Sequence, residues 1–117
     1  MEIDLEKILN HDKKIRFVAK ISYDGDFVDY IHRKDLDLDL TDKQKMRMGA
    51  HVSILADSHR KIDELAGKAA LTFTLRPKVI SIIIYSDAWI FSVSIDRDEN
   101  FCSLTDSISN LVCGPVT

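Results

Sequence analysis

Val79-Ile80-Ser81-Ile82-Ile83-Ile84-Tyr85 is the most apolar run in the chain, and it decides the fold class. β-Branched residues fill most of its positions, which is typical of a central strand covered on both faces. The run is far too short to span a bilayer as a helix. We therefore predict a buried strand in the middle of a sheet, and no insertion into a membrane.

Two more strands are predicted on either side of this run. After the turn at Ser86-Asp87, residues 89–95 return antiparallel to it. Before it, residues 70–75 alternate apolar and polar side chains and end at Arg76-Pro77, as a half-buried strand would. The second half of the chain therefore contains three strands joined by short turns.

The first half contains a hairpin. Residues 15–22 alternate, and Ile15, Phe17, Ala19 and Ile21 are predicted to share one face. Asp24-Gly25 is a strong turn signal, and residues 27–33 run back as the second strand.

Three helices complete the pattern. Residues 2–12 and 101–113 have short amphipathic repeats, and the second of these helices closes at Gly114-Pro115. The longest helix is predicted over 42–65, because Thr41 and Gln44 have the spacing of a capping box and Gly67 is a natural stop. The order α-β-β-α-β-β-β-α predicts an α+β fold, a five-stranded antiparallel sheet with three flanking helices, in a single domain over 1–117.

Composition narrows the possible partners. The 117 residues carry a net charge of −3, with 45% apolar and 30% charged side chains, as in an ordinary globular protein. A mildly acidic chain has no general attraction to nucleic acid or to anionic lipid. The charged N-terminus is unlike a secretory signal. Cys102 and Cys113 would lie roughly 16 Å apart on one helix, too far for a disulfide, which is consistent with a cytoplasmic location.

No pattern in the sequence predicts catalysis. The motifs of nucleotide hydrolases, dinucleotide-binding proteins, serine hydrolases and zinc proteases are absent, and the cysteines lack metal-ligand spacing. We predict no catalytic residue, no cofactor, no metal site and no enzyme activity. The acidic run Asp35, Asp37 and Asp39 is predicted to be a solvated loop, or alternatively an epitope for a basic partner.

The long middle helix carries two stripes. Met48, Val52, Leu55, His59 and Ile62 form an apolar seam, and small residues lie beside it at Gly49, Ser53 and Ala56. Small side chains allow another backbone to approach closely. Either one stripe packs on the sheet and the other on a second copy, or both serve the core of one chain.

The element order resembles that of roadblock/LC7 domains, which share a profilin-like sheet, and the nearest likeness is to small uncharacterised archaeal proteins of that type. The resemblance also rests on Lys14-Ile15-Arg16-Phe17 before the first hairpin and on Arg76-Pro77-Lys78-Val79-Ile80 before a strand ending in Phe91-Ser92-Val93. It implies a homodimer, or a heterodimer, formed by the middle helices and the third strands. The dimer would be a non-catalytic scaffold or platform for a small Ras-like GTPase or another protein. The interface residues expected on this basis are Met46, Gly49, Ala50, Ser53, Ala56, Asp57, Arg60, Ala70, Thr72 and Thr74.

A small-molecule sensor is the alternative function. Sheets with flanking helices in PAS-like and profilin-like folds can enclose ligands in a concave apolar pocket. Tyr30, His32 and Trp89 are the candidate contacts for a ligand or a partner, with Tyr85 nearby in sequence.

Overall fold

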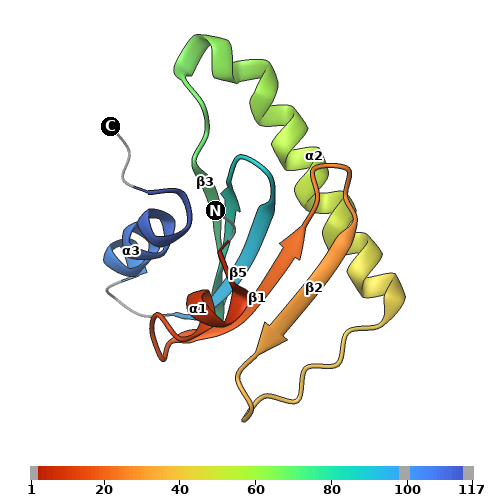
Figure 1. The fold of residues 1–117 in the computed structure, drawn as a ribbon, viewed down its shortest axis with the longest axis vertical. Helices are drawn as coiled ribbons and strands as arrows, with labels where there is room; N and C mark the ends of the chain where they lie inside the picture. Colours follow the sequence, from red (N-terminus) through yellow and green to blue (C-terminus); the bar gives the residue numbers. More distant parts are fainter. Residues whose placement is uncertain (1–2, 98–100, 115–117) are drawn as a thin grey trace.

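The computed structural model describes residues 3–97 and 101–114. Its elements follow the predicted order (Figure 1). They are α1 (Leu5–Leu9), β1 (Ile15–Ile21), β2 (Phe27–His32), α2 (Asp42–Ala66), β3 (Leu71–Leu75), β4 (Val79–Tyr85), β5 (Ile90–Asp96) and α3 (Phe101–Cys113). The first helix was predicted over 2–12, of which residue 2 lies outside the described residues. It begins after Asp4, whose side chain accepts a hydrogen bond from the backbone of Glu6, and it ends at Leu9 with Asn10 as its C-cap.

The five strands form one antiparallel sheet in the order β2-β1-β5-β4-β3. Consecutive strands are sheet neighbours except β2 and β3, and the two halves of the chain meet where β1 pairs with β5. In the middle of this seam Val18 lies opposite Val93. The N-terminal hairpin and the C-terminal three-stranded unit are therefore joined side by side, and β2 and β3 are the two edges of the sheet.

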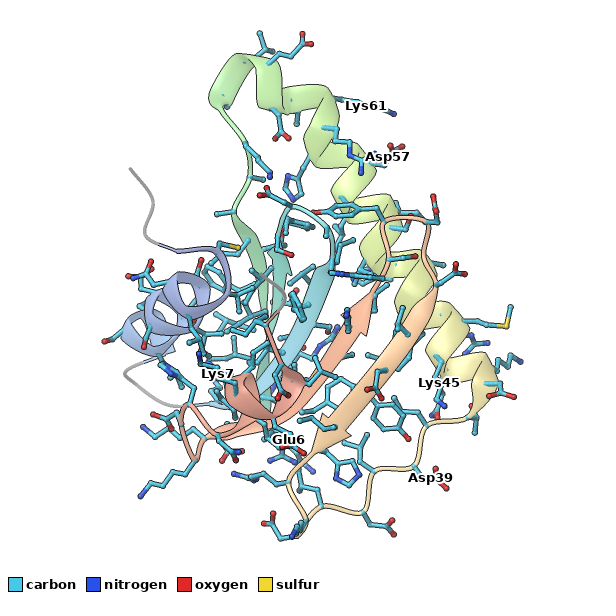
Figure 2. The ribbon with its side chains drawn as sticks, viewed as in Figure 1. Glu6, Lys7, Asp39, Lys45, Asp57 and Lys61 are labelled. Carbon is cyan, nitrogen blue, oxygen red and sulfur yellow. The ribbon has the colours of Figure 1, made fainter. Side chains whose placement is uncertain are left out.

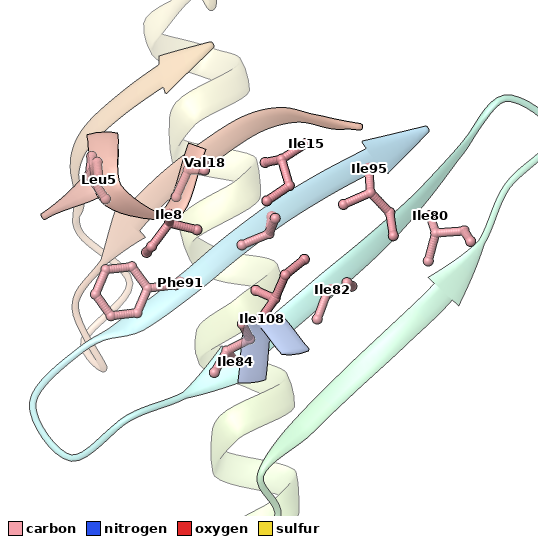
Figure 3. Close-up of a cluster of buried hydrophobic side chains, with 11 residues drawn as sticks. Leu5, Ile8, Ile15, Val18, Ile80, Ile82, Ile84, Phe91, Ile95 and Ile108 are labelled. Atoms are coloured by element: carbon pink, nitrogen blue, oxygen red, sulfur yellow. The ribbon is translucent and has the colours of Figure 1, made fainter. Parts of the chain in front are cut away.

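Helices cover both faces of the sheet. On one face, α1 and α3 cover a cluster of apolar side chains: Ile8 of α1 lies near Val18 and Phe91, and Ile108 of α3 lies over Ile82 and Ile84 of β4 (Figure 3). On the other face, Val52 and Ala56 of α2 pack on Ile83 and Tyr85 of β4. The predicted burial of 79–85 on both faces is thus confirmed for its central part.

A β-bulge in β1 corrects one predicted face. Ile15 lies opposite Ile95 and Phe17 opposite Ser94, so Arg16 is an extra residue between two ladder positions. The bulge sends Ile15 into the cluster below α1 and α3, whereas Phe17, Ala19 and Ile21 face α2. The prediction that all four share a face is wrong for Ile15.

The long helix begins as predicted. The Thr41 hydroxyl accepts a hydrogen bond from the Gln44 backbone, and the Gln44 side chain accepts one from the Thr41 backbone. No helix among the described residues is both long enough and apolar enough to cross a membrane. Cys102 and Cys113 both lie on α3 and are free and exposed, in agreement with the prediction that they form no disulfide with each other.

Candidate functional site

The small-residue stripe of α2 packs on the chain's own hairpin. Gly49 lies against the backbone of Gly25, which adopts a φ of +94° in the β1–β2 turn, a conformation that favours glycine. The Ser53 hydroxyl donates a 2.9 Å hydrogen bond to the carbonyl of Tyr23. Gly49, Ser53 and Ala56 were predicted to face a second copy, and this is wrong because they pack inside one chain.

A hydrogen-bonded group joins α2 to the edge strand β3. The His59 Nε2 and Thr72 Oγ1 atoms are 2.8 Å apart, and Thr72 Oγ1 is 2.9 Å from Tyr85 Oη. The rings of His59 and Tyr85 meet edge to face, with centroids 5.3 Å apart. Burial raises the pKa of the Tyr85 hydroxyl, and the hydrogen bond to Thr72 partly opposes this rise. The Thr72 side chain, predicted at an interface, is therefore engaged within the chain.

The opposite flank of α2 is apolar and exposed. Ile54, Ser58, Ile62 and Leu65 follow one another by four, four and three residues and form one stripe, called here the outer stripe. The exposed fractions of Ile54, Ile62 and Leu65 are 69%, 54% and 89%. At about 100° per residue, the outer stripe lies roughly half a turn from the residues that touch the hairpin. Since the hairpin occupies the β2 side of the sheet, the outer stripe faces the β3 side.

The other predicted interface residues lie at several places. Asp57, with Lys61 one turn later, points from α2 away from the sheet (Figure 2). Met46, Ala50 and Thr74 are exposed, and Ala70 is half-buried. The Arg60 guanidinium lies 5.0 Å from the ring centre of Tyr23, so Arg60 lies on the hairpin side of the helix. A role for these residues in an interface stays a proposal.

The three candidate contact residues do not form one site. The rings of Tyr30 and His32 stack, with centroids 6.4 Å apart, on the α2 side of the sheet. Trp89 packs against the cluster on the other side, with Lys20 Nζ 4.3 Å from its ring centre. A shared pocket for Tyr30, His32 and Trp89 is therefore contradicted.

An ion cluster that sequence reasoning missed lies at one end of the sheet. Arg16 Nη1 is 2.8 Å from Asp96 Oδ1, and Arg33 Nη1 is 3.3 Å from Asp96 Oδ2. Burial alone would raise the pKa of the Asp96 carboxyl, but the two arginines outweigh this effect and hold the pKa below its ordinary value. No pattern in the sequence indicates that Asp96, from the other half of the chain, binds both arginines.

Two clefts meet at the opposite end of the sheet. One has a volume of about 410 Å³ and lies among the linker 68–70, the β4–β5 turn and the end of α3. The other, of about 280 Å³, lies on the α2 side. At the wall of the first, the Cys113 thiol is 3.7 Å from the Tyr85 carbonyl, and burial raises the pKa of that thiol. Within 3–97 and 101–114, no three histidine, cysteine or acidic side chains come together as a metal site.

Solved structures with the same architecture identify the fold. A roadblock/LC7 domain from Streptomyces avermitilis superimposes with a TM-score of 0.68 at 13% sequence identity, covering 95% of this chain and 92% of that one. The chain has the roadblock/LC7 fold.

Two further roadblock-like structures are similar. The gliding protein MglB from Thermus thermophilus has a TM-score of 0.69 at 10% identity, covering 94% of this chain and 82% of that one. MglC from Myxococcus xanthus has a TM-score of 0.56 at 16% identity, covering 92% and 88%. No protein-family model matches the sequence, and no curated protein matches it. The expected closeness to archaeal proteins stays a prediction.

Proposed function

We propose that the protein is a non-catalytic, cytoplasmic homodimer that serves as a scaffold or regulatory platform for a small Ras-like GTPase. The dimer is supported by two observations: the outer stripe of α2 is exposed, and β3 is an edge of the sheet among the described strands. Support for the GTPase comes from the resemblance of the element order to roadblock domains.

The outer stripe and the β3 edge both favour a protein partner. Ile54, Ile62 and Leu65 expose large apolar side chains along one side of α2, and apolar surface of this kind in soluble proteins marks interaction sites. Among the described residues, no strand lies on the outer side of β3, so its backbone groups there are available for pairing with another chain. A second copy related by a two-fold axis would place β3 beside β3 and the outer stripe beside itself, covering both features at once.

This arrangement changes the predicted interface. It keeps the β3 backbone at Thr72 and Thr74, and it replaces Gly49, Ser53 and Ala56 by the outer stripe. Met46, Ala50 and Asp57 lie toward solvent, and Arg60 lies toward the hairpin, so we place these four at most at the rim.

Light scattering after size-exclusion chromatography tests the dimer. A mass near twice 13.3 kDa at micromolar concentration is expected. A monomer mass across this concentration range would contradict the proposal.

Binding measurements test the platform role. Purified small Ras-like GTPases from the source organism, loaded with GDP or with a non-hydrolysable GTP analogue, would be passed over the immobilised dimer. We expect saturable binding that differs between the two nucleotide states for at least one of them. Absence of binding in both states for the whole set would refute this part of the proposal.

A further inference from the structure

The 410 Å³ cleft combines an apolar wall with a charged mouth. Ile3, Trp89, Phe91 and Val112 supply apolar surface on the side of the sheet that α1 and α3 cover. The volume lies in the range of small-molecule sites. The wall therefore suits an apolar group of a ligand, and the charged side chains at the mouth select the polar group that the ligand also carries.

At the mouth, one cation faces one anion. Lys68 Nζ, from the linker between α2 and β3, lies 3.2 Å from Asp87 Oδ1 of the β4–β5 turn. Both side chains are exposed, and both also line the 280 Å³ cleft on the other side. The pair thus lies at the boundary between the two clefts.

The charges at this mouth balance. A purely anionic ligand would meet Asp87, and a purely cationic ligand would meet Lys68, so neither is favoured. A ligand that carries an ammonium group and a carboxylate on the same carbon atom would complement both side chains through charge-assisted hydrogen bonds. An exposed ion pair contributes little stability. Replacing the contact between Lys68 and Asp87 by contacts to such a ligand therefore costs little free energy.

We propose that the cleft binds a free α-amino acid with an apolar side chain. Its carboxylate pairs with Lys68, its ammonium group with Asp87, and its side chain lies against Trp89 and Phe91. None of the residues that line the cleft belongs to the outer stripe, so the proposal does not require dimerisation or a GTPase partner.

Trp89 makes the binding directly measurable, because it is the only tryptophan in the chain. Its emission would be recorded while L-leucine or L-phenylalanine is added, and calorimetry would confirm the affinity. Two analogues separate the charges: 3-phenylpropionate lacks the ammonium group, and 2-phenylethylamine lacks the carboxylate. We expect saturation by the amino acids with a Kd below about 1 mM, and at least roughly tenfold weaker binding of each analogue.

Variants connect the signal to the proposed contacts. Lys68→Met and Asp87→Asn should each weaken binding of L-phenylalanine about tenfold or more. The matched controls Lys61→Met and Asp57→Asn, on the solvent side of α2, should leave it unchanged. Val112→Phe should fill the cleft and abolish the signal, with circular dichroism confirming the fold.

Three results would overturn the proposal. One is the absence of a saturable change up to about 10 mM of either amino acid, a range that covers weak sites. Another is binding of either analogue as tight as that of L-phenylalanine, which would indicate an unselective apolar groove. The third is an unchanged affinity in a folded Lys68→Met variant.

Discussion

Gly49 of α2 lies so close to Gly25 of the hairpin turn that a Cβ atom at position 49 would be 2.0 Å from the Gly25 carbonyl oxygen. The obstacle is backbone, which cannot rotate away as a side chain does. The contact fixes where α2 crosses the β1–β2 turn, and it can be tested by a single methyl group.

Gly49→Ala should destabilise the protein. Alanine favours a helix over glycine by about 1 kcal/mol, but the backbone clash should outweigh this gain and leave a net loss of about 2 kcal/mol. Urea denaturation measures the free energy of unfolding. Asp57→Ala, exposed on the same helix, is the control and should change it by less than about 0.5 kcal/mol. An unchanged or higher free energy of unfolding in Gly49→Ala would show that the β1–β2 turn moves to accommodate the methyl group.

Asp96→Asn should weaken the end of the sheet where Arg16 and Arg33 converge. Since all three side chains are partly exposed, we expect a loss of about 1 kcal/mol at neutral pH. The pKa of Asp96 is lower in the folded protein than in the unfolded chain. The stabilisation is therefore complete above about pH 4 and is lost as the pH falls through the folded value.

The stability difference between Asp96→Asn and the parent protein should accordingly shrink below about pH 4. Asp57→Asn serves as the control at each pH. A difference that stays constant down to about pH 2 would mean that the ion pairs do not account for it.

Thr72→Val should uncouple α2 from β3. Without the Thr72 hydroxyl, His59 and Tyr85 lose a shared hydrogen-bond partner, and the free energy of unfolding should fall by about 1 kcal/mol. The exposed Thr74→Val is the matched control on the same face of the strand. An equal effect of the two substitutions would argue against the hydrogen bonds.

The same substitution should raise the pKa of Tyr85 further. Burial raises this pKa, and the hydrogen bond to Thr72 lowers it, so only the raising effect remains in Thr72→Val. Tyrosinate then forms more readily in the unfolded chain, and stability falls as the pH rises above about 10. NMR titration of ¹³C-labelled tyrosine, assigned with Tyr85→Phe, measures the shift. A lower pKa in Thr72→Val would refute this account.

Ile62→Lys should split the proposed dimer. A lysine at the centre of the outer stripe would bring two positive charges together across a two-fold axis, and we expect dissociation at least about 100-fold easier. Met46→Lys, exposed on the same helix but outside the stripe, should leave the mass unchanged. A dimer that Met46→Lys dissociates and Ile62→Lys does not would contradict the outer stripe as the interface.

Local patterns predicted the element order because each element has a local cause. The turn at Asp24-Gly25 and the capping box at Thr41 act within a few residues, and both are present in the structure. The bulge at Arg16 has a distant cause, since its partner Asp96 lies on a strand from the other end of the chain. No pattern near Arg16 reports that pairing, so the face of Ile15 was misjudged.

The candidate interface was misplaced for two physical reasons. A small-residue stripe shows that some backbone approaches α2, but it does not show whose. The seam through Ile62 was predicted to pack on the sheet, yet α2 with its 25 residues is roughly 37 Å long, against about 23 Å for a seven-residue strand. The helix therefore extends past the sheet (Figure 1), and Ile62 and Leu65 are left exposed.

The pairing of β1 with β5 also has a consequence for how the chain folds. The hairpin and the three-stranded unit contain mostly local contacts and can form early, but the sheet is complete only when Val18 meets Val93. Contacts between such distant residues require closure of a long loop, which slows folding. During synthesis β1 must wait with one edge unpaired until β5 has been made, so the N-terminal hairpin is the part of this protein most in need of protection from aggregation.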